Sequence, residues 1–302
     1  MNTKICFWGC DYKNRPSEYD YLVKDIFSKI DIQEISFVSN IENLTNKDIL
    51  IYHCFDPKQI KNFYPGPTSP TYEQLINICN IVKPNVIIQL SDEHESHKNN
   101  NHNKISNNCN LFIRQYRHLS HEYSKNTLFM PLGYNNGFTN KICDKPISQR
   151  KYNWSWSGSL KNDRMWMISI FSYLSNGNVH INSSLSKSEL YSLYSDSIFV
   201  PCGKGYSSYD CFRIYETIVC GAIPVIVGPK EELLHAFNYN DCDTPFLFYN
   251  TWEEAVNACS EKIKNLDELQ EIQTKHIQWW KKINKNISNK ITENINYVEN
   301  TN

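Results

Sequence analysis

The stretch SIFVPCGKGYSSYDCFRIYETIVCGAIPVIVGP, residues 197–229, decides the fold. An apolar, β-rich run opens it, a glycine-containing loop and an amphipathic segment follow, and a second apolar run closes it. This order predicts a strand, a loop, a helix over 208–220 and a parallel strand, the βαβ unit of α/β domains. On a helical wheel Asp210, Arg213 and Glu216 fall in one polar stripe, so one face of the predicted helix should be accessible to solvent or a ligand.

The loop before this helix is suited to binding an anion. In an open α/β sheet, ligands gather at the carboxyl ends of the strands, where the loop and the helix amino terminus present N–H groups. Arg213 carries a fork of donors for a phosphate, and Glu216, one turn further, can accept from a sugar hydroxyl. The binding candidates in this stretch are Gly205, Tyr206, Ser207, Ser208, Asp210, Arg213 and Glu216.

Two other interpretations of the stretch remain to be weighed. Arg213 and Glu216 could simply form an i,i+3 ion pair on a solvated face, worth a few tenths of a kcal/mol. The Gly203-x-Gly205 pair lacks the third glycine, and the acidic residue about 20 positions later, of a dinucleotide fingerprint. A dehydrogenase is therefore disfavoured.

The rest of the chain repeats the same rhythm of short β-rich runs and amphipathic stretches. It predicts two Rossmann-like, doubly wound α/β domains with parallel sheets. We expect an N-terminal domain over 1–145, a C-terminal domain over 146–265 and a helical tail over 266–302. The polar segment 138–152 is the candidate linker, and the Asn-rich tract 98–108 is expected to be an exposed loop.

Composition excludes several classes of function. The 302 residues include 31 Lys and Arg against 32 Asp and Glu, so a net charge of -1 offers no global field for nucleic acid or an anionic bilayer. No apolar run approaches the length of a membrane span, and the amino terminus lacks a secretory leader. The 11 cysteines are odd in number and form no CxxC pair, which indicates reduced thiols. We expect a cytoplasmic protein, a setting that includes the cytoplasm of an infected host cell.

Two acidic residues are the catalytic candidates. Asp92 and Glu93 follow the predicted strand NVIIQL, a position from which a side chain reaches a cleft and one carboxylate could act as a general base. Adjacent residues on a strand face opposite ways, so at most one reaches a substrate; both could equally be solvated acids at a strand end. The neighbouring HESH segment does not have HExxH spacing, so we expect no metal there.

Arginines elsewhere extend the predicted anion site. Arg164, near the start of the helix predicted from about 161, is expected to converge with Arg213 on a diphosphate, whereas Lys161 is expected to be solvated. Arg114 and Arg117 in FIRQYR are candidates for an acceptor or a donor phosphate. Alternation along a strand places them on opposite faces, so only one should face a cleft.

Several segments resemble GT-B glycosyltransferases, above all the exostosin-like group and its ribitol xylosyltransferase-like relatives. The block 201–229 resembles their nucleotide-sugar half, and Ser91-Asp92-Glu93 resembles their acidic SDE segment. FIRQYR followed by MPLGYNNGF, and NWSWSGSLKNDR over 153–164, are similar to two further segments of the same group. The resemblance implies two domains facing a central cleft, with Arg213 on the donor diphosphate, Glu216 on the ribose and Gly221–Val225 as the turn and strand behind them.

The resemblance implies an inverting, metal-independent glycosyltransferase that uses no cofactor. It would move a sugar, xylose by analogy with the relatives, from a UDP-sugar to a glycan hydroxyl, with no nucleic acid partner. The loop Tyr206–Asp210 departs from the shorter run of many exostosin relatives, which leaves base and sugar specificity open. A GDP-fucose fucosyltransferase is the alternative, although the Tyr-x-Thr-Glu-Lys segment usual there is absent; a non-catalytic nucleotide- or sugar-binding module is another. Oligomeric state is left open.

Overall fold

The computed structural model describes residues 3–10, 13, 15–38, 44–53, 72–91, 93, 101–119, 121–182, 185–205, 207–239 and 243–301. The chain divides into two compact units. The first combines Met1–Pro131 with Asn284–Asn302, and the second is Leu132–Ile283. The long helix α9 (Leu266–Thr301) therefore contributes to both units.

This division differs from the expected boundary at 145/146 and from a separate tail over 266–302. The segment taken for a linker packs into the second unit, because the buried Arg150 donates to the carbonyl oxygens of Tyr194 at 3.2 Å and Ser197 at 2.7 Å. At the other end of the chain, Tyr21 Oη donates to Asn284 Oδ1 at 3.0 Å, which joins the last part of α9 to the first unit. These partners are far apart in the sequence.

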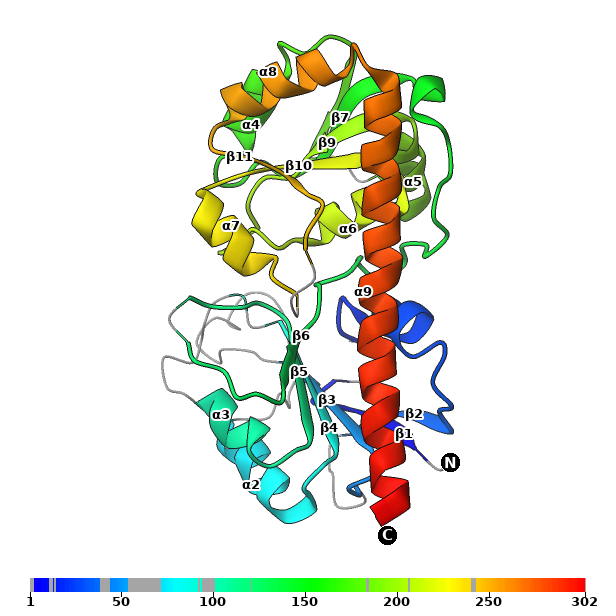
Figure 1. Cartoon of the computed structure of the whole chain (residues 1–302), viewed down its shortest axis with the longest axis vertical. Helices are drawn as coiled ribbons and strands as arrows, with labels where there is room; N and C mark the ends of the chain where they lie inside the picture. Colours follow the sequence, from blue (N-terminus) through cyan, green and yellow to red (C-terminus); the bar gives the residue numbers. More distant parts are fainter. Residues whose placement is uncertain are drawn as a thin grey trace. The chain divides into compact units, whose positions relative to one another are not determined.

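The first unit is built on a parallel sheet in the order β2-β1-β3-β4-β5-β6 (Figure 1). Its strands are β1 (Lys4–Trp8), β2 (Glu34–Val38), β3 (Ile49–His53), β4 (Val86–Leu90), β5 (Leu111–Arg114) and β6 (Thr127–Phe129). Its own helices are α1 (Tyr19–Tyr21), the π-helical turn η1 (Leu22–Ile26), α2 (Tyr72–Val82) and α3 (Asn101–Ser106). Every strand pairing is parallel, as the βαβ rhythm predicts.

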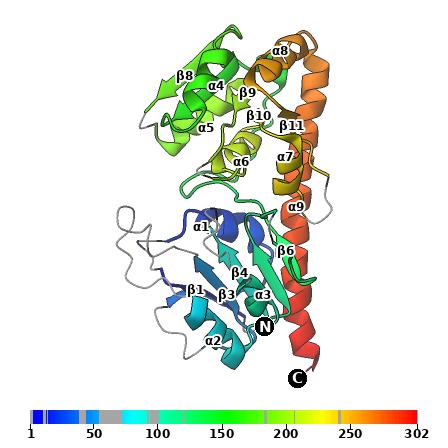
Figure 2. The same ribbon diagram turned by 90° about the vertical axis from the view of Figure 1, so that its left-hand side faces the viewer.

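Apolar side chains run almost without interruption along the central strands and bury both faces of the sheet. Helices α2 and α3 pack against each other and cover one face (Figure 2), where the cluster includes Leu50, Leu75, Ile87 and Phe112. The central strand β4 is buried along its whole length, as expected for a strand with helices on both faces. The tract expected to be an exposed loop contains α3 instead, because its Ile105 is fully buried in this cluster.

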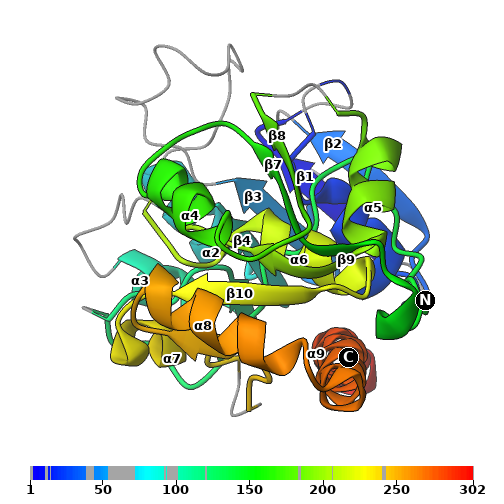
Figure 3. The ribbon, with the colours of Figure 1, turned by 90° about the horizontal axis from the view of Figure 1, so that it is seen from above.

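The second unit repeats the architecture with a parallel sheet in the order β11-β10-β9-β7-β8. Its strands are β7 (Tyr152–Gly158), β8 (Gly177–Ile181), β9 (Ser197–Pro201), β10 (Ile223–Val227) and β11 (Leu247–Tyr249). Its helices, besides the first part of α9, are the 3-10 turn η3 (Ile147–Gln149), α4 (Arg164–Phe171), α5 (Lys187–Ser195), α6 (Phe212–Val219), α7 (Lys230–Ala236) and α8 (Trp252–Lys262). Helix α4 packs against α8 on one side of the sheet, and α5 lies on the other side and packs against α6 (Figure 3).

Large aromatic rings fill the interior of the second unit. Trp154 and Trp156 are buried on β7, and Trp280 stacks on Tyr215 with ring centroids 5.3 Å apart. Trp279 and Trp280 on α9 are 5% and 2% exposed, so both rings belong to this packed interior.

The strand orders define where each sheet can receive a ligand. In both units the first strand lies between the second and the third, so the connections leave in opposite directions from the first and third strands. Ligands of open α/β sheets bind outside the carboxyl ends of the strands at such a switch point. The two positions are the ends of β1 and β3 in the first unit and the ends of β7 and β9 in the second.

Candidate functional site

Arg213 lies at the switch point of the second unit. From the first turn of α6 its Nη2 donates to the carbonyl oxygen of Ser157 at 3.0 Å, and its Nε donates to Tyr194 Oη at 3.3 Å. The guanidinium lies 5.1 Å from the centre of the Trp156 ring. Within the described residues Nη1 has no hydrogen-bond partner, so the fixed guanidinium keeps donors for a ligand.

Gly158 makes this arrangement possible. A Cβ at this position would lie 2.7 Å from Arg213 Nη2 and 3.2 Å from the Trp156 ring. Only a residue without a side chain lets the guanidinium lie against the end of β7.

Arg164 brings a second guanidinium to the same place. Its Nη1 donates to Ser159 O at 3.1 Å and its Nη2 donates to Lys204 O at 3.2 Å, so it ties the loop after β7 to the loop after β9. Desolvation by burial lowers the pKa of Arg164, and the positive charge of Arg213 lowers it further. Two like charges held this close are stabilised when an anion binds between them. The structure thus brings together the two arginines that the sequence analysis paired.

The loop between β9 and α6 is held by its own hydrogen bonds. Asn162 Nδ2 donates to Gly205 O at 2.7 Å, and Gly205 N donates to Ser208 O at 2.8 Å. Ser207 is exposed and Ser208 is half-buried, whereas Tyr206 lies outside the described residues. The first residue before α6, Cys211, makes no side-chain cap, so its side chain does not occupy the first-turn N–H groups.

Asp210 was expected on the wet stripe of a helix over 208–220, but α6 begins at Phe212. The structure places Asp210 in the preceding loop, 2% exposed. Its Oδ1 accepts from Tyr215 Oη at 2.6 Å and its Oδ2 accepts from Tyr239 Oη at 2.7 Å. In this arrangement Asp210 anchors the end of the loop to the interior.

Glu216 lies one turn beyond Arg213 and is buried, 6% exposed. Its carboxylate pairs with Lys187 Nζ at 3.7 Å. Desolvation raises the pKa of Glu216, while the charges of Lys187 and Arg213 act in the opposite direction. No ion pair joins Glu216 to Arg213 in the part of the chain that the structure describes, so the simple i,i+3 pair is not what the structure contains.

A cavity of about 450 Å³ adjoins these loops in the second unit. It opens beside the carboxyl ends of β10 and β11, and its lining combines aromatic rings with amide and charged groups. The lining residues are Asn162, Asp163, Trp166, Lys204, Tyr209, Val227, Gly228, Asn250, Thr251, Trp252 and Glu253. It leaves room for a ligand group next to the loop that Arg164 holds.

The first unit contains the remaining sequence candidates. Glu93 is half-buried shortly after β4, and Asp92 lies outside the described residues. Arg114 is 1% exposed and lies 5.2 Å from the Tyr123 ring centre, inside the unit. Arg117 is half-buried, 5.2 Å from the Phe129 ring centre.

One residue that the sequence analysis missed is Glu18. It follows β1, is 0% exposed, and accepts from Ser91 Oγ at 2.8 Å. The sequence offered no signal for it, because Glu18 opens an ordinary amphipathic stretch and its partner is far along the chain.

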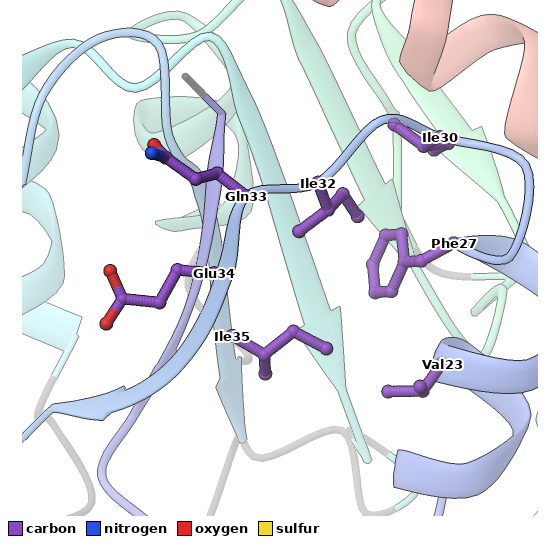
Figure 4. A pocket seen from close by; sticks show the side chains of 7 residues that line it. All are labelled: Val23, Phe27, Ile30, Ile32, Gln33, Glu34 and Ile35. Atoms are coloured by element: carbon purple, nitrogen blue, oxygen red, sulfur yellow. The ribbon is translucent and has the colours of Figure 1, made fainter. Parts of the chain in front are cut away.

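A second cavity, of about 260 Å³, lies in the first unit between η1 and β2 (Figure 4). Its lining is mainly apolar, with Val23, Phe27 and three isoleucines. The one lining carboxylate, Glu34, pairs with Lys4 at 3.2 Å. This cavity has no cationic lining residue and does not suit a phosphate.

The described residues hold no group of three or more His, Cys, Asp or Glu side chains that could bind a metal ion. His94 and His97 of the HESH segment lie outside the described residues. The nearby His102 is buried and stacks on His121 with ring centroids 5.0 Å apart. No described helix has the length and apolarity that a membrane crossing requires. The nine described cysteines are free thiols.

Comparison with known proteins places this architecture. No protein-family model matches the sequence, and no curated protein matches it significantly. By structure the chain is similar to Anabaena HepE in complex with UDP and glucose, with a TM-score of 0.54 and 9% identity over 99% of this chain and 100% of the other. The chain has the GT-B fold.

Two further GT-B structures agree. The DNA-modifying enzyme β-glucosyltransferase gives a TM-score of 0.52 and 12% identity over 97% of this chain and 99% of the other. An α1,3-fucosyltransferase gives a TM-score of 0.50 and 12% identity over 95% and 92% of the two chains. These glycosyltransferases do not single out the exostosin-like or xylosyltransferase group.

Proposed function

We propose that this chain is a glycosyltransferase that uses a nucleotide-sugar donor. The observation that carries the proposal is the convergence of Arg164 and Arg213 at the switch point between β7 and β9. Both guanidiniums are positioned by backbone carbonyls at the carboxyl ends of these strands. A nucleoside diphosphate is the ligand whose charge and double phosphate geometry match two such forks.

We assign the parts of the donor to residues of the second unit as follows. Arg164 and Arg213 hold the diphosphate and stabilise the negative charge that develops as it leaves. The loop over Gly205, Ser207 and Ser208 and the first-turn N–H groups of α6 follow the carboxyl end of β9, the same edge of the sheet that the two arginines occupy. Glu216, which already pairs with Lys187, accepts from a ribose hydroxyl. With these cations neutralising the leaving group, the proposed reaction is metal-independent; inversion stays a proposal that rests on the sequence resemblance.

UDP is the proposed nucleotide. HepE was solved with UDP and glucose, and the β-glucosyltransferase was solved with and without its substrate UDP-glucose. A GDP-fucose donor remains the alternative, since a fucosyltransferase is among the similar structures. Xylose remains the proposal for the transferred sugar, resting on the sequence resemblance alone.

The proposed acceptor is a glycan hydroxyl. The net charge of -1 gives no overall attraction to a polyanion, which disfavours DNA, although one similar structure is a DNA-modifying enzyme. A DNA acceptor therefore belongs in the test as the contrasting arm.

The test is release of free nucleoside diphosphate from UDP- and GDP-sugars, with glycan or DNA acceptors present. Acceptor-dependent release that Arg213→Ala abolishes supports the enzyme. Nucleotide binding without release across the whole acceptor panel supports a non-catalytic module instead.

A further inference from the structure

Glu18 is a buried carboxyl group with one oxygen left over. Its Oε1 accepts from Ser91 Oγ at 2.8 Å. Its Oε2 has no hydrogen-bond partner, and no described Lys, Arg or His side chain forms an ion pair with it. Buried carboxyl oxygens normally accept hydrogen bonds. A buried carboxyl group with one unpaired oxygen therefore indicates a functional role in addition to packing.

Ser91, its partner, is held in an uncommon geometry. It directly follows β4 and has a φ of 54°, a left-handed conformation that is unfavourable for a residue with a side chain. Its backbone N–H donates to Gln115 Oε1 at 2.8 Å, which fixes the turn. Unlike Glu18, Ser91 is only half-buried. Ser91 is therefore the more exposed member of the pair.

The pair occupies a place where ligands of such sheets bind. Glu18 lies in the connection that leaves β1, and Ser91 lies at the carboxyl end of β4, so both are at the carboxyl edge of the first sheet. This edge contains the switch point between β1 and β3. Asp92 and Glu93, the sequence candidates for a base, follow Ser91 directly.

The chemistry of Glu18 suits a group that takes up a proton near neutral pH. Desolvation raises the pKa of Glu18 to about 7, against the lowering effect of the hydrogen bond from Ser91. A base is most effective when its pKa lies near the working pH.

We propose that Ser91 and Glu18 form a two-residue proton relay that deprotonates the acceptor hydroxyl. The inference rests on the proposed function. As the acceptor oxygen forms its bond to the anomeric carbon, its proton passes to Ser91 Oγ, and the Ser91 hydroxyl proton passes to Glu18. The bond from the anomeric carbon to the diphosphate oxygen breaks, and its electron pair leaves with the nucleoside diphosphate. Ser91 touches the acceptor, and Glu18 acts through it.

Two substitutions test the relay in the full-length chain. Glu18→Gln keeps the shape and an oxygen for Ser91 but cannot take up a proton at this pH. Ser91→Gly removes the hydroxyl and favours the observed φ, so the fold is retained. We expect either change to lower kcat by about 10²–10⁴-fold, the usual contribution of general base catalysis, with the KM for the donor unchanged.

The pH profile separates the relay from a structural role. In the wild type, kcat should fall as pH drops through about 7, because Glu18 must be ionised to receive the proton. The acid limb should vanish in Glu18→Gln, and the double variant should be no slower than the slower single one. Glu93→Gln and Asp92→Asn test the two competing candidates for the base, and under the relay the acid limb remains in both.

The inference is overturned if Glu18→Gln keeps wild-type kcat, or if its acid limb is unchanged while the variant still binds nucleotide. It is also overturned if Asp92→Asn or Glu93→Gln abolishes the limb instead. Failure of the proposed function looks different: the wild-type chain itself would bind no nucleotide and release none.

Discussion

Arg213 Nη2 donates a 3.0 Å hydrogen bond to the carbonyl oxygen of Ser157. This bond joins the first turn of α6 to the end of β7, so the guanidinium is oriented before any ligand binds. Pre-orientation lowers the entropic cost of binding, because the side chain has already lost its freedom.

Gly158→Ala should disturb this arrangement without removing a charge. The new methyl group would lie 2.7 Å from Arg213 Nη2 and force the guanidinium to move. We expect UDP affinity, measured by calorimetric titration, to fall about tenfold, which corresponds to about 1.4 kcal/mol. In an Arg213→Ala background the same change should have little further effect, because the two residues act as one. Equal effects in both backgrounds would separate Gly158 from Arg213.

Glu216→Gln should weaken donor binding by about 1–3 kcal/mol, the usual scale for a hydrogen bond to a charged group. Its control is Lys187→Met, which removes the ion partner of Glu216 but not the carboxylate. If Glu216 binds ribose, Glu216→Gln should have much the larger effect on UDP affinity. Donor affinity that survives Glu216→Gln would remove this residue from the site.

The raised pKa of Glu18 should make the free energy of unfolding depend on pH. Burial raises the pKa of Glu18 from 4.5 to about 7, so the folded state holds this proton more tightly than the unfolded chain. Its contribution to stability is fully present below pH 4.5 and is lost as pH rises to about 7, by on the order of 3 kcal/mol. Urea unfolding at pH 4.5 and pH 8 should show this loss in the wild type and not in Glu18→Gln. Parallel pH trends in the two proteins would mean that Glu18 titrates normally.

Tyr239→Phe should loosen the loop before α6. It removes the hydroxyl that donates to Asp210 Oδ2 and leaves a buried carboxylate oxygen without that donor. We expect a loss of about 1–3 kcal/mol of unfolding free energy, together with weaker UDP binding. Tyr173→Phe, on a side chain 81% exposed, is the control and should change neither. A stable variant with normal UDP affinity would show that the Asp210 network does not support the loop.

Local sequence patterns predicted most of the fold. NVIIQL, expected as a strand, is the buried strand β4, because an apolar run reports directly on burial. The start of α6 was misplaced, since Asp210 leaves the helix to bond Tyr239, a partner 29 positions away.

The site was predicted in part for the same reason. Arg213 and Arg164 could be paired because each follows a recognisable strand, whereas Glu18 acquires its environment from Ser91, 73 positions away. Contacts over such separations leave no local pattern in a single sequence. The division of α9 between the two units likewise depends on distant partners, such as Tyr21 for Asn284.

Calorimetric titration of UDP into the wild type and into the Arg164→Ala, Arg213→Ala double variant tests the central claim most directly. Lys264→Ala, which removes an exposed lysine, controls for the loss of positive charge alone. We predict saturable UDP binding in the wild type and in Lys264→Ala, and a loss of at least about 100-fold in the double variant, as expected for removing two charged hydrogen-bond donors. Undiminished UDP binding by the double variant would contradict the account.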